Sequence, residues 1–252
     1  MATFTTNFID FNDLFAVVNG EDSPDVTDLS PLVDLYDEFA DNSRTPVEAG
    51  DQSTIHRTGV MDSMPGVFTV AGTSMGLGDN SWAVNGLIYN NGLDSTLILR
   101  STAGITIDPI QTDEEFTGII NSAIVLFNDG TTEAMFGFTG TINVATGAVT
   151  ANSIRFFSSE NLGEDGFFVV EGTVTGSITG TFDELDGFVV TGGSVTALSI
   201  HVDDGTGDKF FQISGLPAGN TLADNIFPND DLLLDSAEEF EALFATLLSG
   251  AD

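Results

Sequence analysis

The chain contains no cysteine, only five Lys and Arg residues, two histidines and no long apolar run. Without cysteine, disulfides and Cys-based zinc or iron–sulfur sites are excluded. Phosphate backbones are bound by clustered Lys and Arg, so the lack of bases excludes nucleic acid as a partner and argues against an anionic membrane surface. No stretch reaches the roughly 18 apolar residues of a membrane-spanning helix, so we expect no membrane insertion.

Acid is abundant: 39 Asp and Glu residues give a formal net charge of −34 over 252 residues. Charged residues nevertheless make up only 17% of the chain, while 41% is hydrophobic and 21 residues are Phe. This composition favours a folded core over disorder. The absence of Cys and the single Lys predict an extracellular or cell-surface location, with the cytoplasm of a salt-rich cell as the alternative. The N-terminus, MATFTTNFIDFNDLF, lacks the features of a secretory signal peptide, so we expect export by another route.

Hydrophobic spacing divides the chain into three parts. Residues 1–65 are predicted to form short helices and a polar connector, because apolar residues recur at helical spacing over 8–18 and again after Ser30-Pro31. Residues 229–252 are predicted to form a C-terminal amphipathic helix, because Ser236 and Glu239 have capping-box spacing. Its apolar stripe comprises Phe240, Leu243, Phe244, Leu247 and Leu248. The stripe either packs on the protein's own sheet or docks onto a partner.

Residues 66–228 are predicted to form an antiparallel β-domain, because their apolar residues alternate with polar ones. The clearest alternation places five residues on one strand face: Ala134, Phe136, Phe138, Ile142 and Val144. Asn91-Gly92 and Asp129-Gly130 fit hairpin turns, in which a positive φ is needed. Short alternating runs between regular turns predict a sandwich, barrel or roll. The predicted fold class is therefore α+β, mainly antiparallel β.

An internal repeat lies within this domain. AVTANSI at 148–154 resembles SVTALSI at 194–200, and each is followed by a strand with paired Phe, FFVVEG at 167–172 and FFQISG at 210–215. The spacing predicts a duplicated β unit covering about residues 135–172 and 178–215. The alternative is that two unrelated hairpins have similar sequences because both use residues that favour strands and turns.

No catalytic motif is present. His56 and His201 lie far apart, and the chain contains no GxSxG, HExxH or phosphate-binding loop. We therefore predict no catalytic residue, no cofactor other than Ca²⁺, and a protein that is not an enzyme. Hard oxygen ligands crowded into bent loops suit Ca²⁺, although plain hairpin turns are the alternative. The candidate ligands are Asp203, Asp204, Asp208, Asp230 and Asp231.

A family resemblance rests on residues 138–154, FTGTINVATGAVTANSI, and on 210–227, FFQISGLPAGNTLADNIF, with the acidic, Leu- and Phe-rich tail. These stretches resemble acidic, Cys-free bacterial β-proteins exported by type I secretion. The calcium-binding nonapeptides of that class are missing. Its haemophores, to which residues 191–216 are similar, present a His and a Tyr to haem iron. Those ligands do not carry over, because Tyr89 has no neighbouring His in the sequence.

We therefore expect a secreted, non-enzymatic structural or surface protein. It would be a self-assembling subunit of an extracellular matrix, such as a biofilm matrix, of a filament or of a surface layer. Self-assembly implies a homo-oligomer or polymer, formed by strand addition at sheet edges or by insertion of the Phe-rich N-terminal segment. The alternative is a soluble extracellular ligand-binding protein, for haem, a metal or a glycan.

Overall fold

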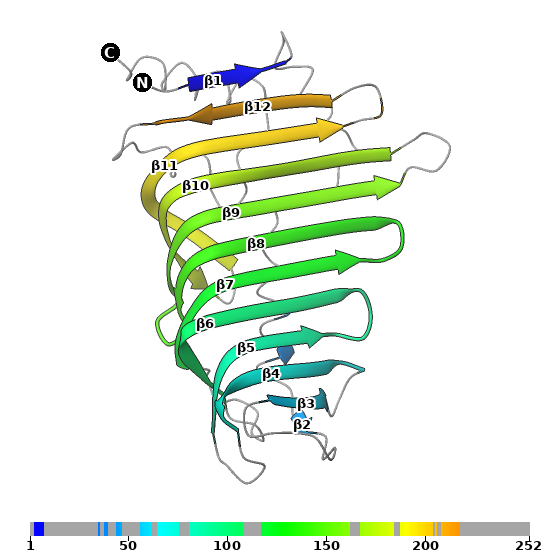
Figure 1. The fold of residues 1–252 in the computed structure, drawn as a ribbon, viewed down its shortest axis with the longest axis vertical. Coiled ribbons are helices and arrows are strands. Elements are labelled where there is room, and N and C mark those ends of the chain that lie inside the picture. The colour runs from blue at the N-terminus through cyan, green and yellow to red at the C-terminus, as the bar shows by residue number, and fades with distance from the viewer. Residues whose placement is uncertain are drawn as a thin grey trace.

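A computed structural model describes residues 3–7, 35, 38–39, 44–46, 56–61, 65–75, 81–107, 117–161, 167–183, 187–203, 205 and 208–216. They form one twelve-stranded antiparallel sheet (Figure 1). Its strands are β1 (Thr3–Thr6), β2 (Arg44–Pro46), β3 (His56–Met61), β4 (Val67–Ser74), β5 (Trp82–Asn90), β6 (Ser95–Ile107), β7 (Thr117–Asn128), β8 (Thr132–Asn143), β9 (Ala148–Asn161), β10 (Phe167–Asp183), β11 (Gly187–Asp203) and β12 (Asp208–Ser214).

The sheet is a meander, in which each strand from β2 to β12 pairs with the next strand in the sequence. β1 is the exception, because it pairs with β12 at the far edge and so brings the N-terminal strand beside the last one. Within the described residues, the two edges are therefore β1, of four residues, and β2, of three residues ending in Pro46.

The long strands bend sharply along one line across the sheet (Figure 1). Every neighbouring pair from β4 to β11 has a register shift. A residue inserted on one strand of a pair is a β-bulge, which bends the strand and increases its twist. Because the bulges lie side by side, their small bends add up to one corner.

Polar side chains satisfy backbone groups along the bend. Asn85 Nδ2 donates to the carbonyl of Ser101 at 3.3 Å, and the Ser101 hydroxyl donates to the carbonyl of Ile119. The Oδ1 atom of Asn121 accepts the backbone N–H of Thr102 at 2.8 Å. Buried backbone groups that lose a ladder partner need a substitute, and these side chains supply it.

Glycines allow the strands to approach closely at the bend. A Cβ on Gly72 would lie 1.9 Å from the carbonyl oxygen of Ala83, and one on Gly140 would lie 2.0 Å from that of Thr150. Gly176 and Gly193 are equally restricted, with a neighbouring carbonyl oxygen at 2.1 and 2.2 Å. Only a residue without a side chain fits at these positions.

The inner face of the sheet forms one hydrophobic core on both sides of the bend. On β6, for example, Leu97 and Leu99 are buried before the bend and Ile105 and Ile107 after it. Phe39 adds to this core from outside the sheet, since its ring centroid lies 5.8 Å from that of Phe68, edge to face. The Phe39 centroid also lies 5.3 Å from that of Tyr89.

The predicted hairpin turns are confirmed, and each is organised by an Asn or Asp side chain. Asn91 Oδ1 accepts the backbone N–H groups of Leu93, Asp94 and Ser95 at 3.0–3.2 Å. Asp129 Oδ1 accepts the N–H groups of Thr131 and Thr132, both at 2.8 Å. The following glycines have φ values of +78° and +93°, the conformation for which glycine is preferred.

The predicted antiparallel β structure is confirmed, including the alternation on β8, where Phe138 and Ile142 are buried. Every element bounded within the described residues is a strand. The helices predicted for 8–18 and 229–252 lie outside those residues. Of the helix predicted after Ser30-Pro31, only Leu35, Glu38 and Phe39 are described; these three residues are helical, but no bounded helix is shown there. None of the described helical residues belongs to a segment long and apolar enough to cross a membrane.

Residues 1–65, predicted to form a helical segment and connector, contribute β1, β2 and β3 to the sheet, and β2 and β3 lie within the predicted connector. Their runs of three to six residues are too short to show a period of two clearly. The repeated heptapeptides lie on β9 and β11, where both segments cross the bend. Ile154 pairs with Val174, whereas Ile200, at the matching position, pairs with Phe211. The similar segments thus take the same place at the bend but form hairpins of different register.

Replacing Gly140 with Ala is expected to destabilise the fold by about 2 kcal/mol or more, because the new methyl group overlaps backbone of β9. Gly137→Ala on the same strand is the control, since its Cβ would meet the nearest atom at an ordinary 3.7 Å. Urea unfolding of both variants measures the difference. Equal stabilities would show that the bend does not depend on this close approach.

The pKa of Asp129 is lowered from its ordinary value by the hydrogen bonds from Thr132 and Thr131. A lowered folded-state pKa means that the charged carboxylate's contribution to stability is fully present above the unfolded pKa. That contribution is lost as the pH falls through the folded pKa. An NMR titration of the Asp129 carboxyl carbon should show a midpoint below that of a peptide Asp, and Thr131→Val should raise it. A midpoint at or above the peptide value would contradict the turn geometry.

Candidate binding site on the outer face of the sheet

The outer face of the sheet consists of the residues that alternate with the core residues. Strand pairing aligns most of them in three rows that start on β3; two rows run through β12 to β1, and the third ends on β12. None of those with a described side chain is buried. The rows are His56, Ala71, Gly86, Arg100, Ser122, Thr139, Ser153, Thr175, Ala197, Ser214 and Thr3; Thr58, Thr69, Ile88, Ile98, Ile124, Gly137, Arg155, Thr173, Ser199, Gln212 and Thr5; and Val60, Val67, Asn90, Thr96, Leu126, Met135, Phe157, Glu171, His201 and Phe210.

Acidic residues are almost absent from these rows. Glu171 is the single acid in them, although the chain has 39 Asp and Glu residues. Arg100 and Arg155 belong to the same rows, as do both histidines. The three rows are therefore close to neutral in a protein with a net charge of −34. The next row of the same face, at the hairpin ends of β8 to β12, carries three further acids: Glu133, Asp203 and Asp208.

The part of the outer face on β3 to β7, here called the apolar half, exposes large hydrophobic side chains. Val67 is 49% exposed, Ile88 48%, Val60 41% and Leu126 39%. Val60 pairs directly with Val67, and Ile88 is followed in its row by Ile98 and Ile124. These side chains therefore form one continuous apolar patch, unlike the single exposed hydrophobic residues that are scattered over most protein surfaces.

A groove of about 420 Å³ lies at the other end of the outer face, on β8 to β12. Phe157 on β9 and Phe210 on β12 are its half-buried aromatic residues, and they belong to the same row. The small residues Thr173 and Ser199 lie between Arg155 and Gln212 in the neighbouring row. In this row, short side chains on β10 and β11 are flanked by long ones on β9 and β12, which leaves a hollow between them.

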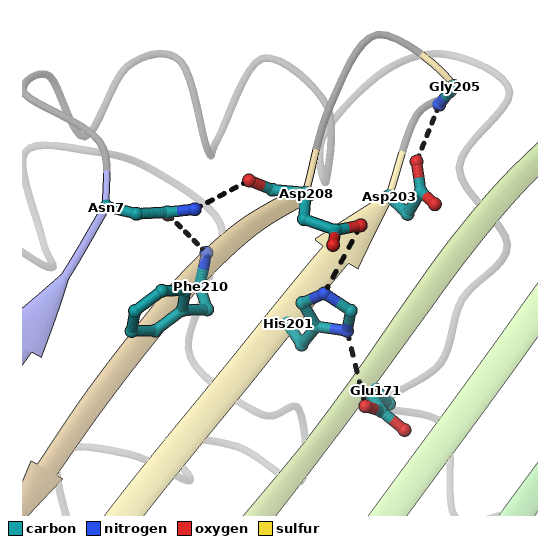
Figure 2. A network of polar contacts seen from close by, with 7 residues as sticks. All are labelled: Asn7, Glu171, His201, Asp203, Gly205, Asp208 and Phe210. Atoms are coloured by element: carbon teal, nitrogen blue, oxygen red, sulfur yellow. Dashed lines mark hydrogen bonds and ion pairs between the residues drawn. The ribbon is translucent and has the colours of Figure 1, made fainter.

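His201 lies in the groove between two carboxylates (Figure 2). Its Nδ1 atom is 3.2 Å from Glu171 Oε1, and its Nε2 atom is 3.6 Å from Asp208 Oδ1. Both carboxylates are more than half exposed, so each pair contributes little to stability. Because both ring nitrogens face carboxylates, neither is directed at a hydroxyl group as a general base would be.

Asn7 fixes the backbone of β12 beside this network (Figure 2). Its Nδ2 atom donates to the carbonyl of Asp208 at 2.7 Å, and its Oδ1 atom accepts the N–H of Phe210 at 2.8 Å. An amide side chain presents the same donor and acceptor as a peptide group. Asn7 thus extends the pairing of β1 with β12 and positions the residue that carries one aromatic ring of the groove.

Arg155 has no hydrogen bond or ion pair in the part of the chain that the structure describes. It is exposed and borders the groove on β9. A guanidinium group offers five N–H donors in a planar fork, and in a chain with 39 acids most cations would find a carboxylate. Arg155 is therefore a donor still open to a ligand.

The structure describes two of the five candidate calcium ligands, Asp203 and Asp208. Asp203 and Asp208 are paired across the β11–β12 hairpin, but Asp203 Oδ1 accepts the N–H of Gly205 at 2.9 Å and Asp208 faces His201. Asp204, Asp230 and Asp231 lie outside the described residues. No group of three or more His, Cys, Asp or Glu residues placed to hold a metal ion is found among the described ones. Calcium binding stays a prediction.

Tyr89, considered above as a haemophore-like ligand, lies on the inner face and is fully buried. Its hydroxyl donates a hydrogen bond to Glu38. Burial and this carboxylate raise the pKa of Tyr89 above its ordinary value. The phenol is therefore held neutral in the core and is not presented to a ligand on the surface.

Comparison with known proteins gives no relative: no family model, no curated protein and no solved structure matches this chain. The outer face must therefore be interpreted from its own chemistry.

Sequence reasoning considered His201 only as a catalytic residue and missed Arg155, Phe157, Glu171 and Phe210. Their shared signal is alternation, since each occupies an outward position next to at least one buried residue on its strand. That signal shows that they face outward, but not that they lie next to one another. Only the pairing register of β9 to β12 brings them together.

Replacing Asn7 with Ala is expected to speed up amide hydrogen exchange at Phe210 at least tenfold, because its N–H loses the acceptor Asn7 Oδ1. Thr5→Ala is the matched control, since it removes a neighbouring side chain but keeps the backbone pairing with Gln212. Unchanged exchange at Phe210 in Asn7→Ala would show that the side chain does not hold β12.

Proposed function

We propose that this protein is a non-enzymatic, extracellular structural protein that associates with a second copy of itself through the apolar half of its outer face. The observation that carries the proposal is the exposed patch around Val67 and Ile88, in three rows that contain a single acid, Glu171 on β10. Monomeric soluble proteins seldom expose large contiguous apolar patches, and such patches mark interaction sites.

Charge favours a second copy on this face over any other. Two copies of a chain with a net charge of −34 repel each other wherever their acidic residues come close. The three rows, however, contain only one acid. Stacked sheets lie about 10 Å apart, which exceeds the Debye length of about 8 Å at physiological salt. Acids on the other surfaces are further away still, so salt screens their repulsion.

The patch is large enough for a reversible interface. The five strands are spaced about 4.8 Å apart, and the three rows are spaced about 6.8 Å apart along each strand. The patch therefore covers roughly 500 Å² on each copy. A pair then buries about 1,000 Å², the lower limit of specific interfaces. The same patch on both copies makes a two-fold symmetric contact, so the expected product is a concentration-dependent dimer from which larger assemblies are built.

The edges of the sheet are less suited to assembly by strand addition. β1 and β2 have four and three residues, and β2 ends in Pro46, which cannot donate a ladder hydrogen bond. Short edge strands with proline are how natural sheets avoid pairing with other chains. Face-to-face contact is therefore the better route. The position of His201 between two carboxylates agrees with a role other than catalysis.

Val67→Lys or Ile88→Lys is expected to weaken self-association at least tenfold, because a charge would be placed in the apolar contact. Leu93→Lys is the matched control. It changes the net charge equally and replaces a large hydrophobic residue that is 79% exposed, more than any other in the described part of the chain, at the tip of the β5–β6 hairpin. Sedimentation velocity at several concentrations and salt strengths measures the effect, and association should strengthen with salt.

Two results would refute self-association through the apolar half. One is a monomer at millimolar concentration in high salt. The other is an equal loss of association in the Leu93→Lys control, which would indicate a general charge effect.

A further inference from the structure

We infer that the groove on β8 to β12 is a binding site for a neutral saccharide chain. This goes beyond self-association and does not depend on it, because the groove lies on different strands from the apolar half. Its aromatic and polar residues carry the inference together.

The aromatic residues suit the faces of sugar rings. Phe157 and Phe210 have only apolar ring atoms to offer, and the C–H-bearing face of a pyranose is the apolar part of an otherwise hydroxylated molecule. The two residues lie three strands apart in one row, or about 14 Å at the usual strand spacing. They are too far apart to sandwich one ring, so they would contact separate rings of a chain that crosses the strands.

The polar residues suit hydroxyl groups, which both donate and accept hydrogen bonds. Arg155 supplies unused donors and Glu171 supplies acceptor oxygens, of which Oε1 faces His201. Gln212 at the edge of the groove offers both a donor and an acceptor. A volume of about 420 Å³ lies in the range of small-molecule sites. A purely apolar ligand would leave these groups without partners, which costs free energy.

Charge selects a neutral saccharide. Glu171 lies inside the groove, and the whole protein carries −34, so a polyanionic glycan would meet repulsion at long and at short range. Arg155 alone does not offset this. A metal ion is no better suited, because no cluster of metal-ligating side chains occurs among the described residues.

The test uses the full chain and two sets of soluble oligosaccharides. The neutral set contains linear β-1,4- and β-1,3-glucan, mannan and galactan oligomers, and the anionic set contains alginate and pectate oligomers. Binding is measured by calorimetry and by NMR shift changes. We expect a neutral oligomer to bind with shift changes confined to β8–β12. Phe157→Ala and Arg155→Gln should each weaken binding at least tenfold.

Two controls separate this site from the rest of the outer face. Ile98→Ala, on β6 in the row of Arg155, should bind as the wild type does. Val67→Lys should lose self-association but keep saccharide binding, so that failure of either proposal is seen separately. Arg155 is exposed, so Arg155→Gln remains informative if Phe157→Ala fails to fold.

Three outcomes would overturn the inference. The first is no binding of any neutral oligomer at 10 mM or below, taken as roughly the weakest useful affinity. The second is binding that Phe157→Ala and Arg155→Gln leave unchanged. The third is binding of alginate or pectate only, which would make the groove an anion site.

Discussion

The structure depends on one constraint: a single sheet must enclose its own core. A sheet with one apolar face needs a second layer to cover it, and the described part of the chain supplies that cover mainly by bending the sheet. The bend requires bulges in register on consecutive strands, side chains such as those of Asn85 and Asn121 to satisfy the displaced backbone groups, and glycines where two strands nearly touch. Each device is local, but the corner forms only because they are aligned across the strands from β4 to β11.

This constraint also explains which features could be predicted from sequence. Alternation and hairpin turns are local, so the strands around Phe138 and the turns at Asn91 and Asp129 were predictable. The bend was not, although mid-strand polar and glycine residues such as Asn121 and Gly140 interrupt the pattern there. Such residues also occur in strands that do not bend. They indicate a bend only when the pairing register is known to place them side by side. The same holds for the groove, whose residues come from strands far apart in sequence.

The distribution of charge is a second consequence of the register. The chain is acidic throughout, yet strand pairing collects Thr, Ser, aliphatic and aromatic residues on the outer face, with Glu171 as the one acid in the three rows. These nearly neutral rows on a strongly charged protein restrict where another molecule can approach without repulsion. The apolar half and the groove share that surface but use different strands, so one face has room for two partners of different chemistry.

The pairing of β1 with β12 also affects the order of folding. All other strands pair with a neighbour in sequence, so the meander can grow one hairpin at a time with small loop-closure costs. β1 has no partner until β12 exists, and the Asn7 contacts join residues 201 and 203 positions apart. At a synthesis rate of about 5–20 residues per second, the N-terminal strand waits roughly ten to forty seconds on the ribosome. Completion of this edge is therefore a late event that requires synthesis to have passed β12.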